Sequence, residues 1–301
     1  MSQKCNICPR SCNASRETAS GFCGAPSELT VSRIGLHQWE EPCVSGDRGS
    51  GTIFFAGCNL RCVFCQNKEI SSTPTGIKNA RKLTVDELAN EMLRLEAAGA
   101  HNINLVTPTH YLHLISKALE AVKGRLCIPV VYNSSAYESV ESLKLLSGLV
   151  DVYLPDLKYF SPELSSKYSS APNYFEVASA AIREMLSQVG ECVFEKGLIK
   201  RGVIVRHLVL PGCRADSMAA LSALAELLPI EKIKISLMRQ YTPDFVDREK
   251  YPELSRRITS FEYDSVLRHA ERLGFDGYIQ SAESASSKYT PSFNSQDAFS
   301  F

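Results

Sequence analysis

Cysteine is the residue type that points most clearly to chemistry in this chain, which contains eleven cysteines among 301 residues. Cys58, Cys62 and Cys65 lie in the run GCNLRCVFCQN with the spacing C-x3-C-x2-C. Three thiolates on one tight loop can hold three irons of a cubane [4Fe–4S] cluster, and the fourth iron is then open to another ligand. The spacing therefore predicts a catalytic iron–sulfur cluster, against the alternative that the three cysteines fall together by chance.

A second group of cysteines lies near the N-terminus, where Cys5, Cys8, Cys12 and Cys23 have the spacing C-x2-C-x3-C-x10-C. This segment is too short for a hydrophobic core of its own, and a bound metal supplies the missing folding free energy in such segments. Four thiolates suit a structural zinc ion and a fully ligated Fe–S cluster equally well. We expect a second metal here, zinc or iron–sulfur, with free or redox-active thiols as the alternative.

The other four cysteines, Cys43, Cys127, Cys192 and Cys213, stand alone. Disulfides are rare in a reducing cytosol, and an isolated cysteine behaves as a small hydrophobic residue. We therefore expect these four to be buried. Cys213 is the one that could line the mouth of a site, because it follows a predicted strand.

The elements that position the first cysteine group begin at residue 52. Short β-rich apolar runs alternate with amphipathic helices, which is typical of βα units around a parallel sheet. Predicted strands cover residues 52–56, 102–107, 129–133, 150–157, 203–210 and 232–240, and predicted helices cover 84–99, 139–149, 174–189, 217–228 and 264–273. Five or six such units form an α/β fold with a partial (β/α)6 TIM-like barrel. The cluster loop follows the first strand, at the end where such barrels place their active sites.

Local signals support parts of this plan. Thr84 and Glu87 form a capping box, and Gly99 closes that helix. The stretch 191–201 (ECVFEKGLIKR) predicts a hairpin inserted before the fifth strand. The chain thus divides into a cysteine-rich metal-binding segment, 1–45, a barrel, 46–280, and a serine-rich tail, 281–301, that we expect to be disordered.

Charge and hydropathy exclude some classes of partner. The chain has 33 Lys and Arg against 33 Asp and Glu, so its charge gives no basis for binding nucleic acid or a membrane surface. No apolar run reaches the ~18 residues of a membrane span, and the first residues contain no apolar signal region. We expect a cytoplasmic protein with neither a membrane nor a nucleic-acid partner.

Taken with the strand that precedes it, the cysteine run resembles the radical S-adenosylmethionine (SAM) superfamily, whose hallmark is C-x3-C-x-aromatic-C after the first strand. Cys58, Cys62, Phe64 and Cys65 match it, and the resemblance covers about 52–280. It implies that the open iron binds the amino and carboxylate groups of SAM, with Phe64 among the cofactor-binding residues. It also implies that one electron cleaves SAM to methionine and a 5′-deoxyadenosyl radical, which abstracts hydrogen from a substrate. The protein positions SAM and excludes water and oxygen.

Within that superfamily the chain looks most like proteins called pyruvate formate-lyase activating enzyme-like, from the segments VTPTHYLHLI, NSSAYESVE, YLPDLKYF, YSSAPNYF and RGVIVRHLVLPG. Activating enzymes of this kind take a hydrogen from a backbone glycine of a partner enzyme, with reduced flavodoxin or ferredoxin as electron donor. Asp156 and Lys158 match their Asp-x-Lys on the fourth strand, and Arg206 and His207 fall where they carry a basic residue. The resemblance implies catalytic roles for Asp156, Lys158 and His207, and a SAM or substrate contact for Arg206.

Two features depart from the family pattern. The usual Gly-Gly-Glu after the second strand, which contacts the SAM amino group, is replaced by VTPT at 106–109. Thr107 could still accept that hydrogen bond through its hydroxyl or its carbonyl oxygen. The N-terminal cysteines are absent from ordinary activating enzymes, which leaves the identity of the partner open.

Alternation along strands predicts which polar side chains face the site. Asp156 and Lys158 share a face and hold the SAM carboxylate or the substrate backbone, unless they form only an internal ion pair. Arg206 and His207 are neighbours, so only one of them points inward.

Further polar residues have weaker assignments. Asn133 and Ser135 could bind the SAM ribose or carboxylate, or else form a helix N-cap network. We expect His110 and His113 to be surface or capping residues, because no third zinc ligand is near them in sequence. Gln240 and Tyr241 close the sixth strand and offer a weak docking place for adenine or the partner.

The sequence therefore favours a cytoplasmic, oxygen-sensitive radical SAM oxidoreductase that acts on a glycine of a partner protein or peptide. One alternative is radical SAM modification of another peptide, a small molecule or RNA. The other is an Fe–S or zinc protein that binds partners without turnover. The missing Gly-Gly-Glu favours the latter, whereas the cysteine spacing, Asp156 and Lys158 disfavour it.

Overall fold

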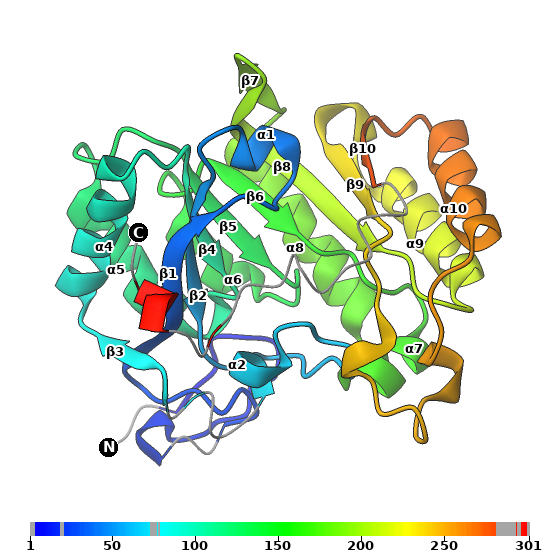
Figure 1. The fold of residues 1–301 in the computed structure, drawn as a ribbon, viewed down its shortest axis with the longest axis horizontal. Coiled ribbons are helices and arrows are strands. Elements are labelled where there is room, and N and C mark those ends of the chain that lie inside the picture. Colours follow the sequence, from blue (N-terminus) through cyan, green and yellow to red (C-terminus); the bar gives the residue numbers. More distant parts are fainter. Residues whose placement is uncertain are drawn as a thin grey trace.

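The computed structural model describes residues 4–18, 21–72, 77, 79–280, 293 and 296–299, and a curved, mainly parallel sheet runs through its centre (Figure 1). In the described part of the chain, seven strands lie parallel in the order β2-β4-β5-β6-β8-β9-β10. Their bounds are Ser50–Phe55, Ile103–Val106, Val130–Ser134, Val152–Pro155, Leu198–Leu208, Lys234–Met238 and Gly277–Ile279. The predicted α/β fold with an open, partial barrel is confirmed, and the short β10 adds a parallel strand to the six predicted.

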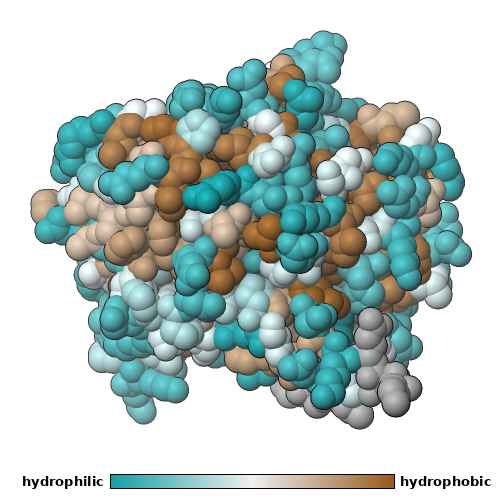
Figure 2. Space-filling model, turned by 180° about the vertical axis from the view of Figure 1, so that it is seen from behind, coloured by the Kyte–Doolittle hydropathy of each residue, from teal (hydrophilic) through white to brown (hydrophobic). Residues whose placement is uncertain are grey.

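Helices connect the strands and cover the outer face of the sheet. They are α2 (Lys68–Ser72), α4 (Val85–Ala97), α5 (Leu112–Val122), α6 (Val140–Leu143), α7 (Pro162–Ser169), α8 (Tyr174–Val189), α9 (Arg214–Leu227) and α10 (Ser260–Leu273). Short 3-10 turns are η1 (Arg16–Thr18), η2 (Thr109–Tyr111), η3 (Lys144–Leu146), η4 (Ile230–Lys232), η5 (Pro243–Phe245) and η6 (Pro252–Leu254). Seen from behind, the surface is mainly hydrophilic with hydrophobic residues interspersed (Figure 2), which fits helices that bury one side.

Two of the predicted helices can be compared with the structure, and one of them is shorter than expected. The capping box before α4 is confirmed, since the Thr84 hydroxyl accepts the Glu87 N–H at 3.2 Å and the Glu87 carboxylate accepts the Thr84 N–H at 2.7 Å. The helix expected over 139–149 is shorter, because α6 passes into the 3-10 turn η3 and ends there.

An antiparallel extension widens the sheet beyond the predicted barrel. Strand β1 (Leu29–His37) pairs antiparallel with β2, and β3 (Arg81–Leu83) pairs antiparallel with β1. Sequence analysis assigned neither strand. Residues 29–37 therefore belong to the barrel sheet although they lie within the segment 1–45, and the cysteine-rich segment that precedes the sheet covers 4–28. The predicted hairpin over 191–201 is confirmed, with β7 (Val193–Glu195) antiparallel to the start of β8.

The N-terminal ends of the parallel strands are closed by α1 (Pro42–Ser45). Cys43 and Val44 of this helix pack against Val131, Val152 and Ile204 in a cluster separate from the main core. The opposite end of the barrel carries the cluster loop.

The tail 281–301 lies outside the described residues except for Phe293 and 296–299. Of these, Gln296–Phe299 form the 3-10 turn η9, which contacts β1, and the Phe293 ring lies 5.5 Å from the Phe54 ring. Within the described residues, no helix is both long and apolar enough to cross a membrane.

Candidate active site

The loop after β2 brings the first cysteine group to the carboxyl end of the barrel. Cys58, Cys62 and Cys65 all line one cavity of about 230 Å³. The loop begins at Gly57, whose φ is +90° and whose missing Cβ would lie 2.8 Å from the carbonyl oxygen of Cys23. Both the left-handed conformation and this close approach require glycine. The Gly57 N–H donates to the Ile70 carbonyl at 2.8 Å, which ties the loop to α2.

The three thiols fit an Fe–S cluster by their chemistry. Burial, together with the neighbouring Cys62 and Cys65, raises the pKa of Cys58 to about 12. Burial also raises the pKa of Cys62, while Lys158 lowers it. The buried thiolates therefore need cationic partners, and cluster irons are such partners.

The arrangement of the cysteines agrees with a multi-iron group. Within the described residues, no three Cys, His, Asp or Glu side chains are placed to hold one metal ion. A cubane cluster does not need that closeness, because each thiolate binds a different iron. The predicted ligand set thus suits a [4Fe–4S] cluster better than a single ion.

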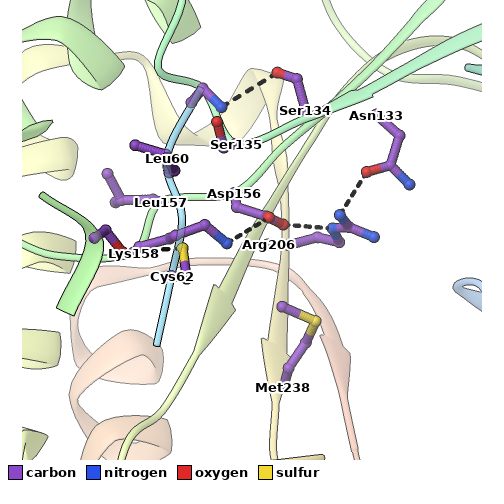
Figure 3. Close-up of polar contacts among 12 residues, drawn as sticks. Leu60, Cys62, Asn133, Ser134, Ser135, Asp156, Leu157, Lys158, Arg206 and Met238 are labelled. Atoms are coloured by element: carbon purple, nitrogen blue, oxygen red, sulfur yellow. Dashed lines mark hydrogen bonds and ion pairs between the residues drawn. The ribbon is translucent and has the colours of Figure 1, made fainter. Parts of the chain in front are cut away.

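A chain of charged side chains crosses the same cavity (Figure 3). The Lys158 ammonium lies 2.7 Å from the Asp156 carboxylate, which also accepts from Arg206 Nε at 2.8 Å. Arg206 continues to the Asn133 side-chain oxygen at 2.6 Å. Burial alone would raise the pKa of Asp156, but Arg206 and Lys158 lower it below its usual value. The sequence allowed an ion pair or a binding role, and the geometry combines an ion pair with a position on the cavity wall.

Glu40 completes this network and was missed by the sequence analysis. Its carboxylate lies 3.3 Å from Arg206 and accepts from the Asn104 side chain at 3.0 Å. Burial raises the pKa of Glu40, against the opposing effect of Arg206. No sequence signal marked this residue, because its position depends on β1, which was not predicted.

The predicted SAM-binding residues also line the cavity: Phe64, Thr107, Asn133, Ser135 and Arg206. Thr107 has a φ of 57°, a left-handed conformation that is rare for a β-branched residue. Its N–H donates to the Asn133 carbonyl at 2.9 Å.

The buried hydroxyl of Ser135 has no hydrogen-bond partner in the described structure. A cavity wall with an unpartnered hydroxyl fits a polar ligand. Gln240 and Tyr241 lie on the same wall, as expected for the end of the sixth strand.

His207 corrects the predicted set of catalytic residues. Arg206 points into the cavity, and its neighbour His207 therefore points away and is not among the lining residues. The His207 side chain is fully buried, with Nδ1 2.6 Å from the Leu157 carbonyl oxygen. Burial lowers the pKa of His207 to about 4. This residue supports the end of β6 rather than contacting a substrate.

Two further expectations are corrected by burial. His110 is not a surface residue, since it is 2% exposed with Nε2 2.7 Å from the Ala56 carbonyl oxygen. Cys127 is exposed rather than buried, whereas Cys43 is buried as expected. Cys213 is partly buried and does not line the barrel cavity.

The N-terminal cysteines lie outside the barrel cavity but next to its loop. Cys8 is buried, Cys5 and Cys23 are partly buried, and Cys12 is exposed. The Cys58 N–H donates to the Cys23 carbonyl at 3.3 Å, so the two cysteine groups are in direct backbone contact.

Comparisons with known proteins agree with this geometry. Residues 52–212 match the family model of the radical SAM superfamily. An uncharacterized protein of Methanocaldococcus jannaschii is 34% identical over 284 residues, covering 91% of this chain and 76% of that protein. Two solved structures are similar in fold. A radical SAM methyltransferase from Sphaerobacter thermophilus has a TM-score of 0.51 at 15% identity, over 77% of this chain and 66% of that one. A mutant of spore photoproduct lyase has a TM-score of 0.53 at 13% identity, over 82% and 79%.

Proposed function

The chain belongs to the radical SAM superfamily, and we propose that it cleaves SAM reductively in order to abstract hydrogen from a glycine of a partner protein or peptide. The observation that carries the proposal is the single cavity shared by the three loop cysteines, Asp156, Lys158 and Arg206. Cys58, Cys62 and Cys65 would hold the [4Fe–4S] cluster. When bound, the cluster and SAM supply a 5′-deoxyadenosyl radical through one-electron cleavage of the sulfonium.

The charged residues of the wall position the ligands. Lys158 and Arg206 offer N–H donors to a carboxylate or a backbone carbonyl, and charge-assisted hydrogen bonds of this kind are the stronger ones. Asp156 touches both cations and fixes their orientation. Asn133 is held by Arg206, while the hydroxyl of Ser135 remains available to a ribose or carboxylate.

Two residues are assigned to the other parts of SAM and to the exclusion of water. Thr107, in place of the family's Gly-Gly-Glu, offers its hydroxyl or its carbonyl to the amino group. The Phe64 ring is 7% exposed and lies edge-on to Tyr241, with 6.2 Å between ring centroids. This apolar pair keeps solvent from the cysteine loop.

The charge of the cavity favours a neutral peptide segment as substrate. Glu40 and Asp156 balance Lys158 and Arg206, and all four line the wall. RNA binding relies on an excess of Lys and Arg against phosphates, which this wall lacks. A small-molecule substrate is the second candidate, since the polar side chains of this cavity wall suit it too. We include a cytoplasmic location and reduced flavodoxin or ferredoxin as electron donor in the proposal.

The first test separates an enzyme from a partner-binding Fe–S protein. Anaerobically reconstituted protein with SAM and dithionite should form 5′-deoxyadenosine. A protein with a full complement of iron that forms none would be the non-catalytic alternative.

The second test identifies the hydrogen donor. Partners are co-purified from an anaerobic host grown with glycine deuterated at Cα, and then incubated with the reconstituted enzyme and unlabelled SAM. Deuterium in 5′-deoxyadenosine, together with a glycyl radical signal in electron paramagnetic resonance, supports the proposal. Turnover without deuterium transfer, with the partner modified elsewhere, would reject glycine while keeping the SAM chemistry.

A further inference from the structure

We propose that Cys5, Cys8, Cys12 and Cys23 bind a second metal centre through four thiolates, and that this centre holds the cluster loop of the barrel in position. Zinc and an Fe–S cluster share this ligand chemistry, and the arrangement favours the cluster, because no three of the described Cys, His, Asp or Glu side chains are placed around one ion whereas each thiolate of a cluster binds a different iron. The inference concerns residues 4–28 and does not depend on the substrate proposed above.

Backbone pairing closes the first three cysteines into one loop. The Cys5 N–H donates to the Ala14 carbonyl at 3.1 Å, and the Asn13 N–H donates to the Cys5 carbonyl at 3.0 Å. Cys8 and Cys12 lie within this loop. Ser11 and Asn13 have φ angles of 40° and 51°, and such left-handed conformations persist only where surrounding contacts hold them.

Cys23 returns to the same loop. A Cβ on Gly21 would lie 3.5 Å from the Cys12 sulfur and 3.9 Å from the Cys23 sulfur, so both sulfurs flank this glycine. The Ser11 N–H donates to the Cys8 carbonyl at 3.0 Å, so a tight turn joins Cys8 to Ser11, next to Cys12. The sulfurs of Cys12 and Cys23 therefore lie on either side of Gly21, and backbone hydrogen bonds hold Cys5 and Cys8 in the same loop.

The segment has little else to hold this shape. Between residues 4 and 28 the described structure contains only the 3-10 turn η1 and an isolated bridge between Lys4 and Ser15. Its fully or largely buried residues are Cys8, Arg16 and Ala25. A thiolate–metal centre supplies folding free energy to segments that lack a core, and the loop that carries the four cysteines is where it would bind.

The contacts of the segment explain what the centre would do. The Cys23 carbonyl accepts the N–H of Cys58, and Arg10 Nε donates to the Asn59 carbonyl at 2.8 Å. Arg10 also donates to the carbonyl of Ser169 at 3.2 Å, and the Ser169 hydroxyl donates to the Cys62 sulfur. A fixed N-terminal segment would thus restrain Cys58 directly. It would also restrain Ser169, whose hydroxyl bonds the Cys62 sulfur.

The test uses a full-length triple variant, Cys58→Ser, Cys62→Ser and Cys65→Ser, purified anaerobically. Because its barrel cluster cannot form, any stoichiometric metal belongs to the N-terminal group. We expect about one centre per chain, read as zinc alone or as iron with acid-labile sulfide. Native alkylation followed by mass spectrometry should leave Cys5, Cys8, Cys12 and Cys23 protected until a chelator is added, while the exposed Cys127 is labelled throughout. A metal-free triple variant whose N-terminal thiols are labelled as fast as Cys127 overturns the proposal.

A second experiment tests whether the N-terminal segment restrains the loop that carries Cys58 and Cys62. In the variant that combines Cys5→Ser, Cys8→Ser, Cys12→Ser and Cys23→Ser, amide hydrogen exchange over residues 57–62 should accelerate at least tenfold, while exchange in α8 is unchanged. If this variant does not fold, Cys12→Ser replaces it, because Cys12 is exposed and its loss leaves no buried gap. Unchanged exchange over 57–62 in a folded variant that has lost the metal would reject the clamp.

Discussion

The hydroxyl of Ser169 donates a hydrogen bond of 2.9 Å to the sulfur of Cys62. The Tyr159 hydroxyl lies 2.8 Å from the same Ser169 oxygen, and it is the donor of that contact because the Ser169 hydrogen is directed to sulfur. Both side chains are buried. Hydrogen bonds to ligand sulfurs tune the potential of a cluster, so with Cys62 as the proposed ligand this pair would help to set that potential.

Replacing Ser169 by Ala should make the cluster harder to reduce. The lost hydrogen bond stabilises the more negative, reduced state by about 1 kcal/mol more than the oxidised state, which corresponds to a shift of about 40 mV toward negative potential for a one-electron couple. Redox titration followed by electron paramagnetic resonance measures it. Ser165→Ala is the control, since Ser165 lies on the same helix and its hydroxyl donates to the Pro162 carbonyl, not to a cysteine sulfur. An unchanged potential would remove Ser169 from this role.

Replacing Cys58, Cys62 or Cys65 by Ala should abolish iron binding in the barrel and SAM cleavage together, because each removes a cluster ligand. Iron content and 5′-deoxyadenosine formation are measured on anaerobically reconstituted protein. Cys127→Ala should change neither. A triple-alanine variant that still makes 5′-deoxyadenosine contradicts the assignment.

Lys158→Met should weaken SAM binding by about ten- to a hundredfold, through the loss of a charge-assisted hydrogen bond worth about 1.5–3 kcal/mol. Asp156→Asn should cost more stability than Lys158→Met, about 3–5 kcal/mol, because it leaves two buried cations with weakened partners. SAM affinity and urea unfolding distinguish the two effects. Unchanged affinity with a large loss of stability would assign the pair to structure alone.

Thr107→Gly should stabilise the protein by about 0.5–1 kcal/mol. A left-handed backbone costs a non-glycine residue about 1–2 kcal/mol, and the entropy cost of glycine offsets only part of that gain. Urea unfolding without SAM measures the change. Thr109→Gly is the matched control and should destabilise, because Thr109 has no positive φ and donates to Glu138 at 2.6 Å. A destabilised Thr107→Gly variant would show that the contacts of the Thr107 side chain contribute more to stability than the left-handed backbone costs.

Stability should fall as the pH drops below about 6.5, the ordinary histidine pKa. Burial lowers the pKa of His110 to about 3, so between pH 3 and 6.5 the unfolded chain binds more protons and stability rises with pH. His110→Gln should flatten the slope by up to about 1.4 kcal/mol per pH unit. Urea unfolding at pH 5 to 6.5 measures it, and an unaltered slope would mean that His110 is not buried neutral.

Glu138 should affect the pH dependence of stability in the direction opposite to His110. Burial raises the pKa of Glu138 to about 7, so its contribution to stability is complete below pH 4.5 and is lost as the pH rises through 7. Glu138→Gln should therefore steepen the rise of stability between pH 5 and 6.5. The same unfolding series tests this, and a flatter slope would contradict it.

Features encoded in short stretches could be predicted from the sequence. The cysteine spacing after an apolar strand, and Thr84 with Glu87 before a helix, depend on residues within one turn or loop, and both lie where expected. Strand alternation predicted that only one of Arg206 and His207 faces inward. It could not choose between them, because that choice requires the register of β8 against β6.

The missed residues depend on contacts between distant parts of the chain. Glu40 reaches Arg206 only because β1 runs antiparallel to β2, and the Ser169–Cys62 contact joins residues 107 positions apart. His110 is buried through contacts that its own stretch of sequence does not reveal, since its Nε2 lies 2.7 Å from the Ala56 carbonyl oxygen and Arg16 donates to its backbone carbonyl. Such pairs leave no periodic or spacing signal in a single sequence.

The docking of the N-terminal segment has a consequence for synthesis of the protein. Its partners lie far downstream, since Arg16 bonds His110, Ser142 donates to the Ile7 carbonyl, and Arg10 bonds Ser169. A chain emerging from the ribosome at ~5–20 residues per second therefore exposes Cys5, Cys8, Cys12 and Cys23 for many seconds before their binding surface exists. These thiols meet the cell's oxidants, chaperones and metal donors before they meet the barrel. With the metal centre proposed above, the yield of correctly folded protein should therefore depend on metal supply during translation more than on metal added to the finished chain.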